Sequence, residues 1–249
     1  VYLLTILISK LVHLTIVFNV QFKVFHPNSS TRRESSVSNV LVVDPKNPSV
    51  SAISRALKII RTGGLIVYPT DTVYGLGANA LNVQAVLRVF EVKRRPLDQP
   101  LPVAVSGSRM SEELAYLNEK ARRLMEVFWP GALTIVLERK TKIPSVVTGG
   151  KAGVGLRAPD NEVPLSIMRL SNLPLITTSA NKHGAPPCVD ARGVVGQLDG
   201  EVDLIIDGGR GRTEASTIID LLREPPVILR RGPVSRESIE GVIGFVEET

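Results

Sequence analysis

The chain has 249 residues, of which 43% are hydrophobic, 22% charged and 4% aromatic, and its formal net charge is +6. This length can bury a full hydrophobic core, and the composition is ordinary for a globular protein. One cysteine and three histidines exclude a disulfide framework and a multi-cysteine metal site, and they leave little material for a histidine-based metal site or a Ser–His–Asp triad.

The first 38 residues differ from the rest of the chain. Residues 1–25 are rich in Val, Ile, Leu and Phe, but Lys10 and His13 leave no uncharged apolar stretch of about 18 residues, as a membrane span requires. No basic region or small-residue cleavage site marks a signal peptide, so we expect no membrane association and a cytoplasmic protein. The chain begins with Val and has no Met before Met110. We expect residues 1–38 to be an extension from an over-extended gene start, and residues 39–249 to be one domain.

From Leu41 onward, short apolar runs alternate with amphipathic segments that begin at capping residues and end at glycine or proline. In chain order, the pattern of the first half predicts a strand at 41–43, a helix from Ser49 to Gly63 and Gly64, a strand at 65–69, a helix from Asn82 to 93–95, a strand at 101–106 and a helix from Ser111 to Pro130. The pattern of the second half predicts strands at 133–138 and 154–158, a helix near 163–172, strands at 173–179, 202–207, 216–221 and 227–231, and a helix near 235–244. About nine strands and four or five helices indicate an α/β domain with a twisted, mixed β-sheet and flanking helices.

The segment PTDTVYGLGANA, residues 69–80, is the first candidate for a ligand site. Its second half matches the dinucleotide pattern G-x-G-x-x-G/A, but that pattern needs its first glycine directly after a strand. Residues 70–74 separate the strand ending at Pro69 from Gly75, the first glycine of the pattern, so the context does not fit. Pro69 instead places Thr70 and Thr72 in a turn whose hydroxyls can face a ligand. The alternative is a polar turn that only caps backbone groups.

The basic run Lys93, Arg94 and Arg95, followed by Pro96, ends a predicted helix. Cations at a helix C-terminus are favoured by the helix dipole, by roughly 0.3–1 kcal/mol each, which would explain the run structurally. The functional alternative is a phosphate clamp, since guanidinium groups pair with two phosphate oxygens at once.

A third candidate is LITTSAN, residues 175–181, where a strand runs into hydroxyl and amide side chains before Gly184. Such a loop can present donors to an anion, or it can be a simple turn at a strand end. It lacks the lysine pattern of a P-loop. Arg157 and Arg230 also lie near strand ends, where side chains point into loops.

Together these segments are more specific than any one of them. PTDTVYGLGANA, KRRPLDQPL, FWPGALTIVL, VGLRAP, TSAN, STIID and ILRRGP follow one another in the order and spacing of the YrdC/Sua5 family, which the chain resembles over residues 40–249. The resemblance implies a single YrdC-like catalytic domain with a concave basic groove, in the short form without a C-terminal second domain. It implies a threonylcarbamoyl-AMP synthase, which joins L-threonine, bicarbonate and ATP, with Mg²⁺ on the ATP, and releases pyrophosphate for tRNA modification.

The resemblance also implies roles for individual residues. Thr70, Thr177, Ser216 and Arg157 would bind threonine, with Arg157 on its carboxylate and Thr177 in the wall towards the nucleotide. The residues that would bind ATP are Lys93, Arg95, Gln99, Ser179, Asn181 and Arg230, and of these Lys93, Arg95 and Ser179 would be catalytic. We expect no protein side chain to ligate a metal. The chain departs from the family pattern at Gln99, Ala104 and Pro187.

Two other functions fit the same sequence. A basic groove could bind duplex RNA or tRNA through its phosphates without any adenylate chemistry. A carbamoyl-transfer domain of the hydrogenase-maturation type would share the fold, although such proteins carry cysteine-rich domains and this chain has one cysteine. For the synthase, tRNA and the threonylcarbamoyl-transferase complex are the expected partners.

Overall fold

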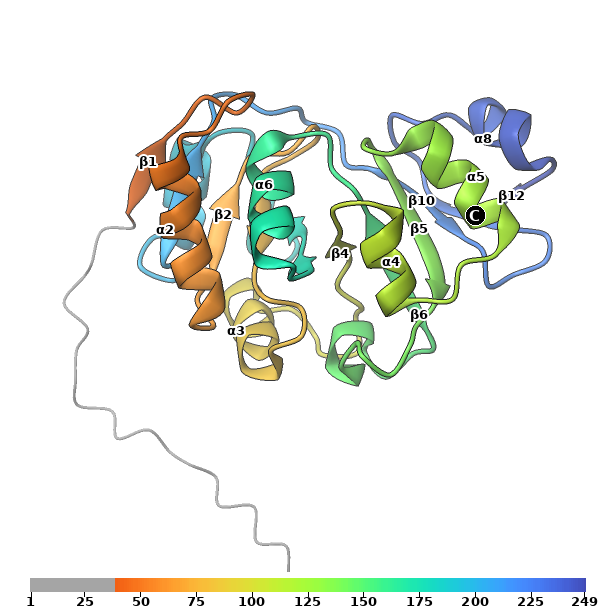
Figure 1. Ribbon diagram of the computed structural model, residues 1–249, viewed down its shortest axis with the longest axis horizontal. Coiled ribbons are helices and arrows are strands. Elements are labelled where there is room, and N and C mark those ends of the chain that lie inside the picture. Colours follow the sequence, from red (N-terminus) through yellow and green to blue (C-terminus); the bar gives the residue numbers. More distant parts are fainter. Residues whose placement is uncertain (1–38) are drawn as a thin grey trace, which may run out of the picture. The chain divides into compact units, whose positions relative to one another are not determined.

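The computed structural model describes residues 39–249, so the expectations for residues 1–38 lie outside the described residues. The described residues belong to one compact unit (Figure 1). Its α-helices are α2 (Val50–Arg61), α3 (Val83–Lys93), α4 (Ser108–Leu114), α5 (Glu119–Phe128), α6 (Glu162–Ser171), α7 (Ala191–Leu198) and α8 (Arg236–Ile243), with a 3₁₀ turn at Ser145–Thr148. Its strands are β1 (Val40–Val42), β2 (Ile66–Tyr68), β3 (Gly75–Gly77), β4 (Val103–Ala104), β5 (Leu133–Glu138), β6 (Gly153–Arg157), β7 (Leu175–Ile176), β8 (Thr178–Ser179), β9 (Leu204–Asp207), β10 (Thr217–Asp220), β11 (Val227–Arg230) and β12 (Glu247–Glu248).

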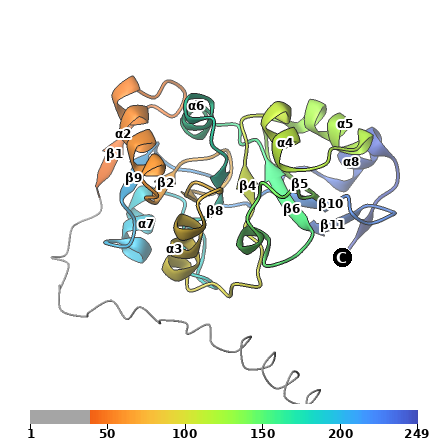
Figure 2. The ribbon, with the colours of Figure 1, turned by 60° about the horizontal axis from the view of Figure 1, so that its bottom comes forward.

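The strands form two mixed sheets, which we call the first and the second sheet. The first has the order β1-β9-β2-β3-β8, and the second has the order β12-β11-β10-β5-β6-β4-β7. Helices α2, α3, α6 and α7 lie with the first sheet, whereas α4, α5 and α8 lie with the second (Figures 1 and 2). The α/β class and the mixed pairing were predicted correctly, but the single sheet was wrong.

The second sheet arises because the predicted strand 173–179 divides at Thr177. β7 pairs with β4 in the second sheet, whereas β8 pairs with β3 in the first. At the division, the backbone N–H of Thr177 donates to the carbonyl of Pro102 at 2.9 Å. The chain therefore crosses between the sheets at Thr177, a residue expected at the site.

Capping explains where most helices begin. Ser49, Asn82, Asn118 and Ser235 each accept a backbone N–H from the first turn of α2, α3, α5 and α8. The predicted long helix 111–130 is wrong, because Ala115 pairs with Arg139 and Asn118 then starts a new helix. The sequence reading also missed α7, β3 and β12, and β4 is shorter than the strand predicted at 101–106.

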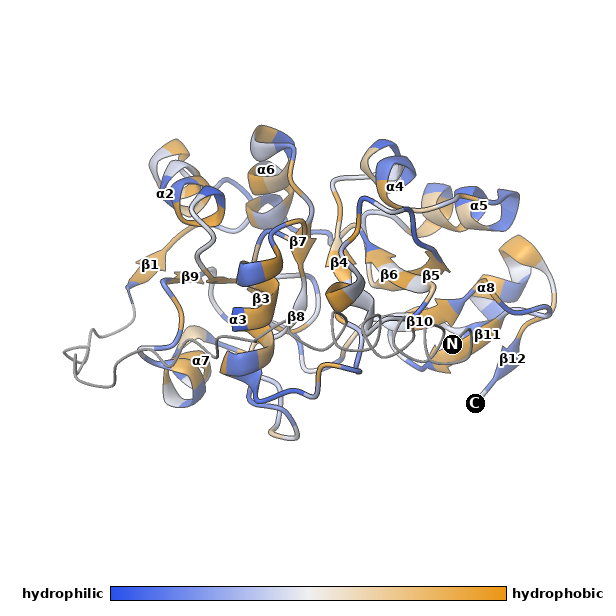
Figure 3. Cartoon of the chain, turned by 90° about the horizontal axis from the view of Figure 1, so that it is seen from below, coloured by the Kyte–Doolittle hydropathy of each residue, from blue (hydrophilic) through white to orange (hydrophobic). Residues whose placement is uncertain are grey.

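A continuous cluster of buried apolar side chains runs through both sheets and contacts the inner faces of the helices. Figure 3 shows the strands mostly in hydrophobic colours, whereas helices such as α5 carry both colours. In α2 the buried residues recur every three or four positions, as expected for one helix face; they are Ala52, Ile53, Ala56, Leu57 and Ile60. This shared core holds the two sheets as one scaffold for the cavity between them.

Candidate functional site

A cavity of about 680 Å³ lies where residues from both sheets meet. The predicted site residues that line it are Thr70, Arg95, Arg157, Thr177, Ser179, Ser216 and Arg230. Three other predicted residues do not line it: Lys93, Gln99 and Asn181. The charged lining residues are Arg95, Lys151, Arg157, Arg223 and Arg230 against Asp220. Residues from distant parts of the sequence therefore meet in one place, as the motif reading expected.

Arg157, at the end of β6, is 6% exposed and is held by acceptors on three sides. Its Nε donates to the carbonyl of Gly131 at 2.8 Å, Nη1 donates to Thr72 Oγ1 at 2.8 Å, and Nη2 pairs with Asp71 Oδ1 at 2.5 Å. A guanidinium has five N–H donors. The described partners therefore leave one N–H on each terminal nitrogen, the pair that a carboxylate can accept in a forked arrangement.

The turn after β2 supplies the partners of Arg157. Thr70 Oγ1 donates to the carbonyl of Val73 at 2.7 Å and accepts the backbone N–H of Thr72 at 3.0 Å. Asp71 Oδ1 also accepts the backbone N–H of Asp160 at 3.1 Å. Thr70 therefore caps backbone groups and also lines the cavity, while its contact with a ligand stays a prediction.

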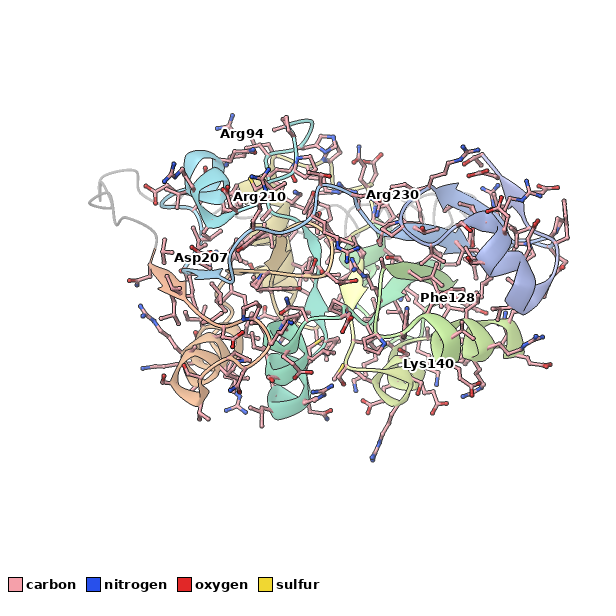
Figure 4. The ribbon with its side chains drawn as sticks, turned by 90° about the horizontal axis from the view of Figure 1, so that it is seen from above. Arg94, Phe128, Lys140, Asp207, Arg210 and Arg230 are labelled. Carbon is pink, nitrogen blue, oxygen red and sulfur yellow. The ribbon has the colours of Figure 1, made fainter. Side chains whose placement is uncertain are left out.

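On the second sheet, Ser216 and Arg230 are coupled. Arg230 Nε donates to the carbonyl of Ser216 at 2.9 Å, and Nη2 donates to Ser216 Oγ at 3.1 Å. Ser216 Oγ also lies 2.8 Å from Thr134 Oγ1. Burial, with the charge of Arg157 as a second cause, lowers the pKa of the Arg230 guanidinium. Figure 4 shows Arg230 beside the ribbon segment that joins the two halves of the unit.

Arg95 is also held by hydrogen bonds to backbone carbonyls, in this case those of residues that follow it closely in the sequence. Its Nε donates to the carbonyl of Gln99 at 3.3 Å, and its Nη2 donates to the carbonyl of Pro100 at 3.0 Å. Burial lowers the pKa of the Arg95 guanidinium. Like Arg230, Arg95 is anchored through Nε and Nη2, which leaves its Nη1 N–H groups for a ligand in the cavity.

Lys93 differs from the arginines because it is buried behind the loop that carries Ser179. It is 1% exposed, and its Nζ donates to the carbonyls of Ser179 and Asn181, at 2.5 Å and 2.7 Å. Burial, aided by the charges of Arg95 and Lys182, lowers the pKa of Lys93 to about 8. Arg94, which adopts a left-handed backbone conformation, is exposed and points outward (Figure 4).

Asn181 holds the same loop from within. Its Nδ2 donates to the carbonyls of Lys182 and Ala185, at 2.8 Å and 2.7 Å. Its Oδ1 is buried and has no hydrogen-bond partner in the described part of the chain. Lys93 and Asn181 thus shape the loop that presents Ser179, while the predicted contacts of both with ATP stay predictions.

The structure also shows where the three positions that depart from the family pattern lie. Ala104 is fully buried in β4, the Gln99 carbonyl receives Arg95, and Pro187 lines the cavity. Thr72, which the sequence placed in a turn that can face a ligand, lines the cavity. Sequence reasoning missed Thr134 as a lining residue, although it lies within the motif FWPGALTIVL.

No helix within residues 39–249 combines the length and the apolar character needed to cross a membrane. The same residues contain no group of three or more His, Cys, Asp or Glu side chains arranged to hold a metal ion.

Comparison with known proteins identifies the family to which the chain belongs. A family model covering Sua5, YciO and YrdC, described as "Telomere recombination", matches residues 58–232. The threonylcarbamoyl-AMP synthase of Pyrococcus abyssi is 45% identical over 193 residues, which are 77% of this chain and 57% of that protein.

Two solved structures agree with this. Pyrococcus abyssi Sua5 complexed with L-threonine superposes with a TM-score of 0.82 at 41% identity, over 85% of this chain and 63% of that one. Escherichia coli YciO superposes with a TM-score of 0.76 at 28% identity, over 81% of this chain and 99% of that one. The chain thus spans about 60% of the length of its Pyrococcus relatives. It belongs to the Sua5/YciO/YrdC family.

Proposed function

We propose that this chain is a threonylcarbamoyl-AMP synthase, a nucleotidyltransferase that converts L-threonine, bicarbonate and ATP into threonylcarbamoyl-AMP and pyrophosphate. One observation carries the proposal: three arginines held by hydrogen bonds line the same cavity. Arg157 can offer two N–H groups to a carboxylate, and Arg95 and Arg230 lie in the same lining. The names of its relatives, which include a threonylcarbamoyl-AMP synthase and a Sua5 complexed with L-threonine, support the same reaction.

Threonine would bind at the Arg157 end. The carboxylate would accept the remaining N–H groups of Arg157, while Thr70, Thr177 and Ser216 would contact the rest of the amino acid. Arg157 is a suitable partner because its pairing with Asp71 and Thr72 fixes the plane of the guanidinium before the ligand arrives. A preorganised donor loses little entropy on binding.

The phosphates of ATP would bind towards Arg95, Ser179 and Arg230. Anchored arginines suit this role because they present N–H groups at fixed positions to oxygens that gain charge during the reaction. Lys93 would contribute through the Ser179 loop and through its positive charge. Asn181 would contribute by fixing the loop that presents Ser179, and Gln99 by holding Arg95 through its carbonyl.

The reaction needs no covalent enzyme intermediate. The amine of threonine and bicarbonate condense to a carbamate with loss of water, and a carbamate oxygen then attacks the α-phosphorus of ATP. The bond between the α-phosphorus and the bridging oxygen breaks, and pyrophosphate takes the electron pair. Arg95, Arg230 and Ser179 would stabilise the charge on the phosphate oxygens, which is where catalysis by fixed donors is strongest.

We propose that Mg²⁺ enters with ATP. The acid nearest to Arg157, Asp71, is paired with that arginine, and the charged side chains that line the cavity are cationic apart from Asp220. Phosphate oxygens and water are therefore the ligands that fit, in keeping with the usual coordination of this ion. Bound there, Mg²⁺ would neutralise charge on the departing pyrophosphate.

The names of the relatives favour the synthase over an RNA-binding module or a hydrogenase-maturation domain. We propose that the product passes to a threonylcarbamoyl-transferase complex acting on tRNA in the cytoplasm.

The decisive experiment is pyrophosphate release from ATP and Mg²⁺, with threonine, bicarbonate or the enzyme omitted in turn, and with the product identified by mass. We expect release only when all components are present. Release that continues without threonine would contradict the proposal, and so would salt-sensitive binding of duplex RNA in a protein that forms no adenylate.

A further inference from the structure

Arg95 is held by the loop that follows it in the sequence. This loop, residues 96–100, comes after α3 and contains no helix or strand. Arg95 donates through Nε to the carbonyl of Gln99 at 3.3 Å and through Nη2 to the carbonyl of Pro100 at 3.0 Å. The position of the guanidinium in the cavity therefore depends on the path that residues 96–100 take.

A second segment, residues 145–150, holds this loop at two points. The backbone N–H of Leu101, directly after the loop, donates to the carbonyl of Val147 at 2.8 Å. Within the loop, the backbone of Asp98 packs against Gly149. The two contacts fall on either side of the two carbonyls that hold the arginine. The segment therefore fixes the part of the loop on which the guanidinium depends.

The segment is itself held firmly in the connection between β5 and β6 of the second sheet. It contains the 3₁₀ turn Ser145–Thr148, in which Val147 is fully buried. Thr148 is fully buried as well, and its Oγ1 donates to the carbonyl of Lys151 at 2.8 Å. Residues 145–150 thus provide a fixed support for the loop.

No side chain fits at Gly149. Its backbone is left-handed, with φ +58°, and an added Cβ would lie 2.5 Å from the carbonyl oxygen and 2.7 Å from the carbonyl carbon of Asp98. Non-bonded carbon atoms pack best at about 3.5–4.0 Å, so the loop and the segment would have to separate by roughly 1 Å. The atoms that Cβ would meet belong to the backbone, which cannot turn aside as a flexible side chain can. A side chain at Gly149 would therefore displace the loop that holds Arg95.

We propose that Gly149 is a positioning residue for ATP binding. Because it has no side chain, residues 145–150 can hold the loop in the path that places Arg95 in the cavity. The inference rests on the proposed function, which assigns the phosphates of ATP to Arg95. Gly149 does not line the cavity itself, so a substitution there reaches ATP only through the residues that it displaces.

The neighbouring Gly150 provides a matched control. It is also left-handed, with φ +79°, but an added Cβ would meet no atom within 4 Å in the described part of the chain. Gly149→Ala and Gly150→Ala therefore impose a similar backbone strain on the same segment, and only the first contacts Asp98. Gly150 is also nearer to Lys151, which lines the cavity, so an effect transmitted through Lys151 would appear in the control as well.

The first measurement is the affinity of each variant for ATP with Mg²⁺, in the absence of threonine. Gly149→Ala should bind ATP about tenfold to a hundredfold more weakly than Gly150→Ala, because displaced donors lose their hydrogen bonds to a charged group. Equal affinities for ATP in the two variants would show that the proposal is wrong.

Threonine affinity, measured without nucleotide, should be the same in both variants. The partners of Arg157 all lie outside residues 96–100 and 145–150, so the threonine end of the cavity keeps its geometry. The threonine titration also gives the fraction of protein that is folded in each sample. A loss of threonine affinity equal to the loss of ATP affinity would mean that Gly149 acts on the whole cavity and not on Arg95, which contradicts the proposal.

A double-variant cycle tests whether the effect passes through Arg95. If it does, Gly149→Ala should weaken ATP binding in the wild-type background and have little further effect in Arg95→Ala, which has no guanidinium to displace. Losses that simply add in the double variant would exclude the route through Arg95.

Gly149→Asn keeps the test informative where the alanine variant folds poorly. Asn adopts the left-handed conformation more readily than Ala, yet it brings the same Cβ towards Asp98. It should therefore lose ATP affinity as well, and wild-type affinity in this variant would overturn the proposal. Binding is measured without turnover, so absence of threonine-dependent pyrophosphate release in the wild type would count against the proposed function alone.

Discussion

Arg157 and Asp71 form a buried ion pair in which Nη2 lies 2.5 Å from Oδ1 and the side chains are 7% and 15% exposed. Asp71 also accepts the backbone N–H of Asp160, and Arg157 reaches Gly131 and Thr72. The pair thus joins the turn after β2 in the first sheet to the end of β6 in the second. Its geometry matters more than its charge, because it determines where the last two guanidinium N–H groups point.

Arg157→Lys should raise the KM for threonine strongly and leave the KM for ATP little changed. Lysine keeps the positive charge but offers no forked pair of donors. It also cannot donate hydrogen bonds to Gly131, Thr72 and Asp71 at the same time. Removing one partner of a hydrogen-bonded buried charge pair costs about 2–5 kcal/mol, which corresponds to at least a thirtyfold effect. The KM for threonine is measured from the rate of pyrophosphate release at several threonine concentrations.

The control for this variant is Arg169→Lys, since Arg169 is an exposed arginine paired with Glu162 on α6. Its kinetics should match the wild type. An Arg157→Lys enzyme with unchanged dependence on threonine would show that the carboxylate binds elsewhere.

Ser216→Ala should weaken threonine binding by about tenfold. The change leaves Arg230 Nη2 and Thr134 Oγ1 without the hydroxyl that now joins them, and a lost hydrogen bond of this kind costs roughly 1 kcal/mol or more. Calorimetric titration with threonine measures the change directly. Ser51→Ala, an exposed position on α2, is the control. Equal affinities for all three proteins would exclude Ser216 from the threonine site.

The helices that sequence reading found share two local signals. α2, α3 and α8 begin at a side chain that caps the first turn, and α2 shows a clear apolar period. Both signals lie within a few neighbouring residues, so they are readable without the fold. The break at Ala115 depends on pairing with Arg139, and the break at Thr177 depends on Pro102. Such distant partners cannot be read from a local pattern.

The same limit explains the site. Motif order identified several of the residues that line the cavity, because Thr70, Arg157 and Arg230 lie at strand ends or directly after them. It could not distinguish a cation facing the cavity from one buried behind a loop. Lys93 and Arg95 are two residues apart, yet only Arg95 lines the cavity. The path of the loop at 179–181, to which Lys93 donates, decides between them.

Lys93 should give the protein an unusual dependence of stability on pH. Burial lowers its pKa from 10.5 to about 8, so between these values the unfolded chain binds more protons than the folded one. The free energy of unfolding therefore rises with pH across this window. Below about pH 8 the buried ammonium group destabilises the folded state to its full extent. The rise attributable to Lys93 is at most roughly 3 kcal/mol.

Urea unfolding at several pH values between 7 and 10.5 measures this effect. The free energy of the wild type should increase relative to that of Lys93→Met as the pH rises. Lys120→Met, which changes an exposed lysine paired with Glu224, should track the wild type instead. Parallel curves for the wild type and Lys93→Met would mean that the two carbonyl bonds keep Lys93 charged throughout.

Gly77→Ala should destabilise the protein, because β3 lies directly against the ring of Tyr68. A Cβ at Gly77 would lie 2.4 Å from Tyr68 Cε1, and Tyr68 is fully buried, so the ring has little room to move. Overpacking of a closed core typically costs about 1–3 kcal/mol. The matched control is Gly196→Ala on α7, where no atom lies within 4 Å of the added Cβ. There alanine should stabilise by about 0.4–1 kcal/mol through helix propensity and reduced freedom of the unfolded chain. The two variants make the same chemical change, so shifts of opposite sign in thermal unfolding would isolate the contact with Tyr68. A neutral Gly77→Ala would mean that β3 does not need glycine at this position.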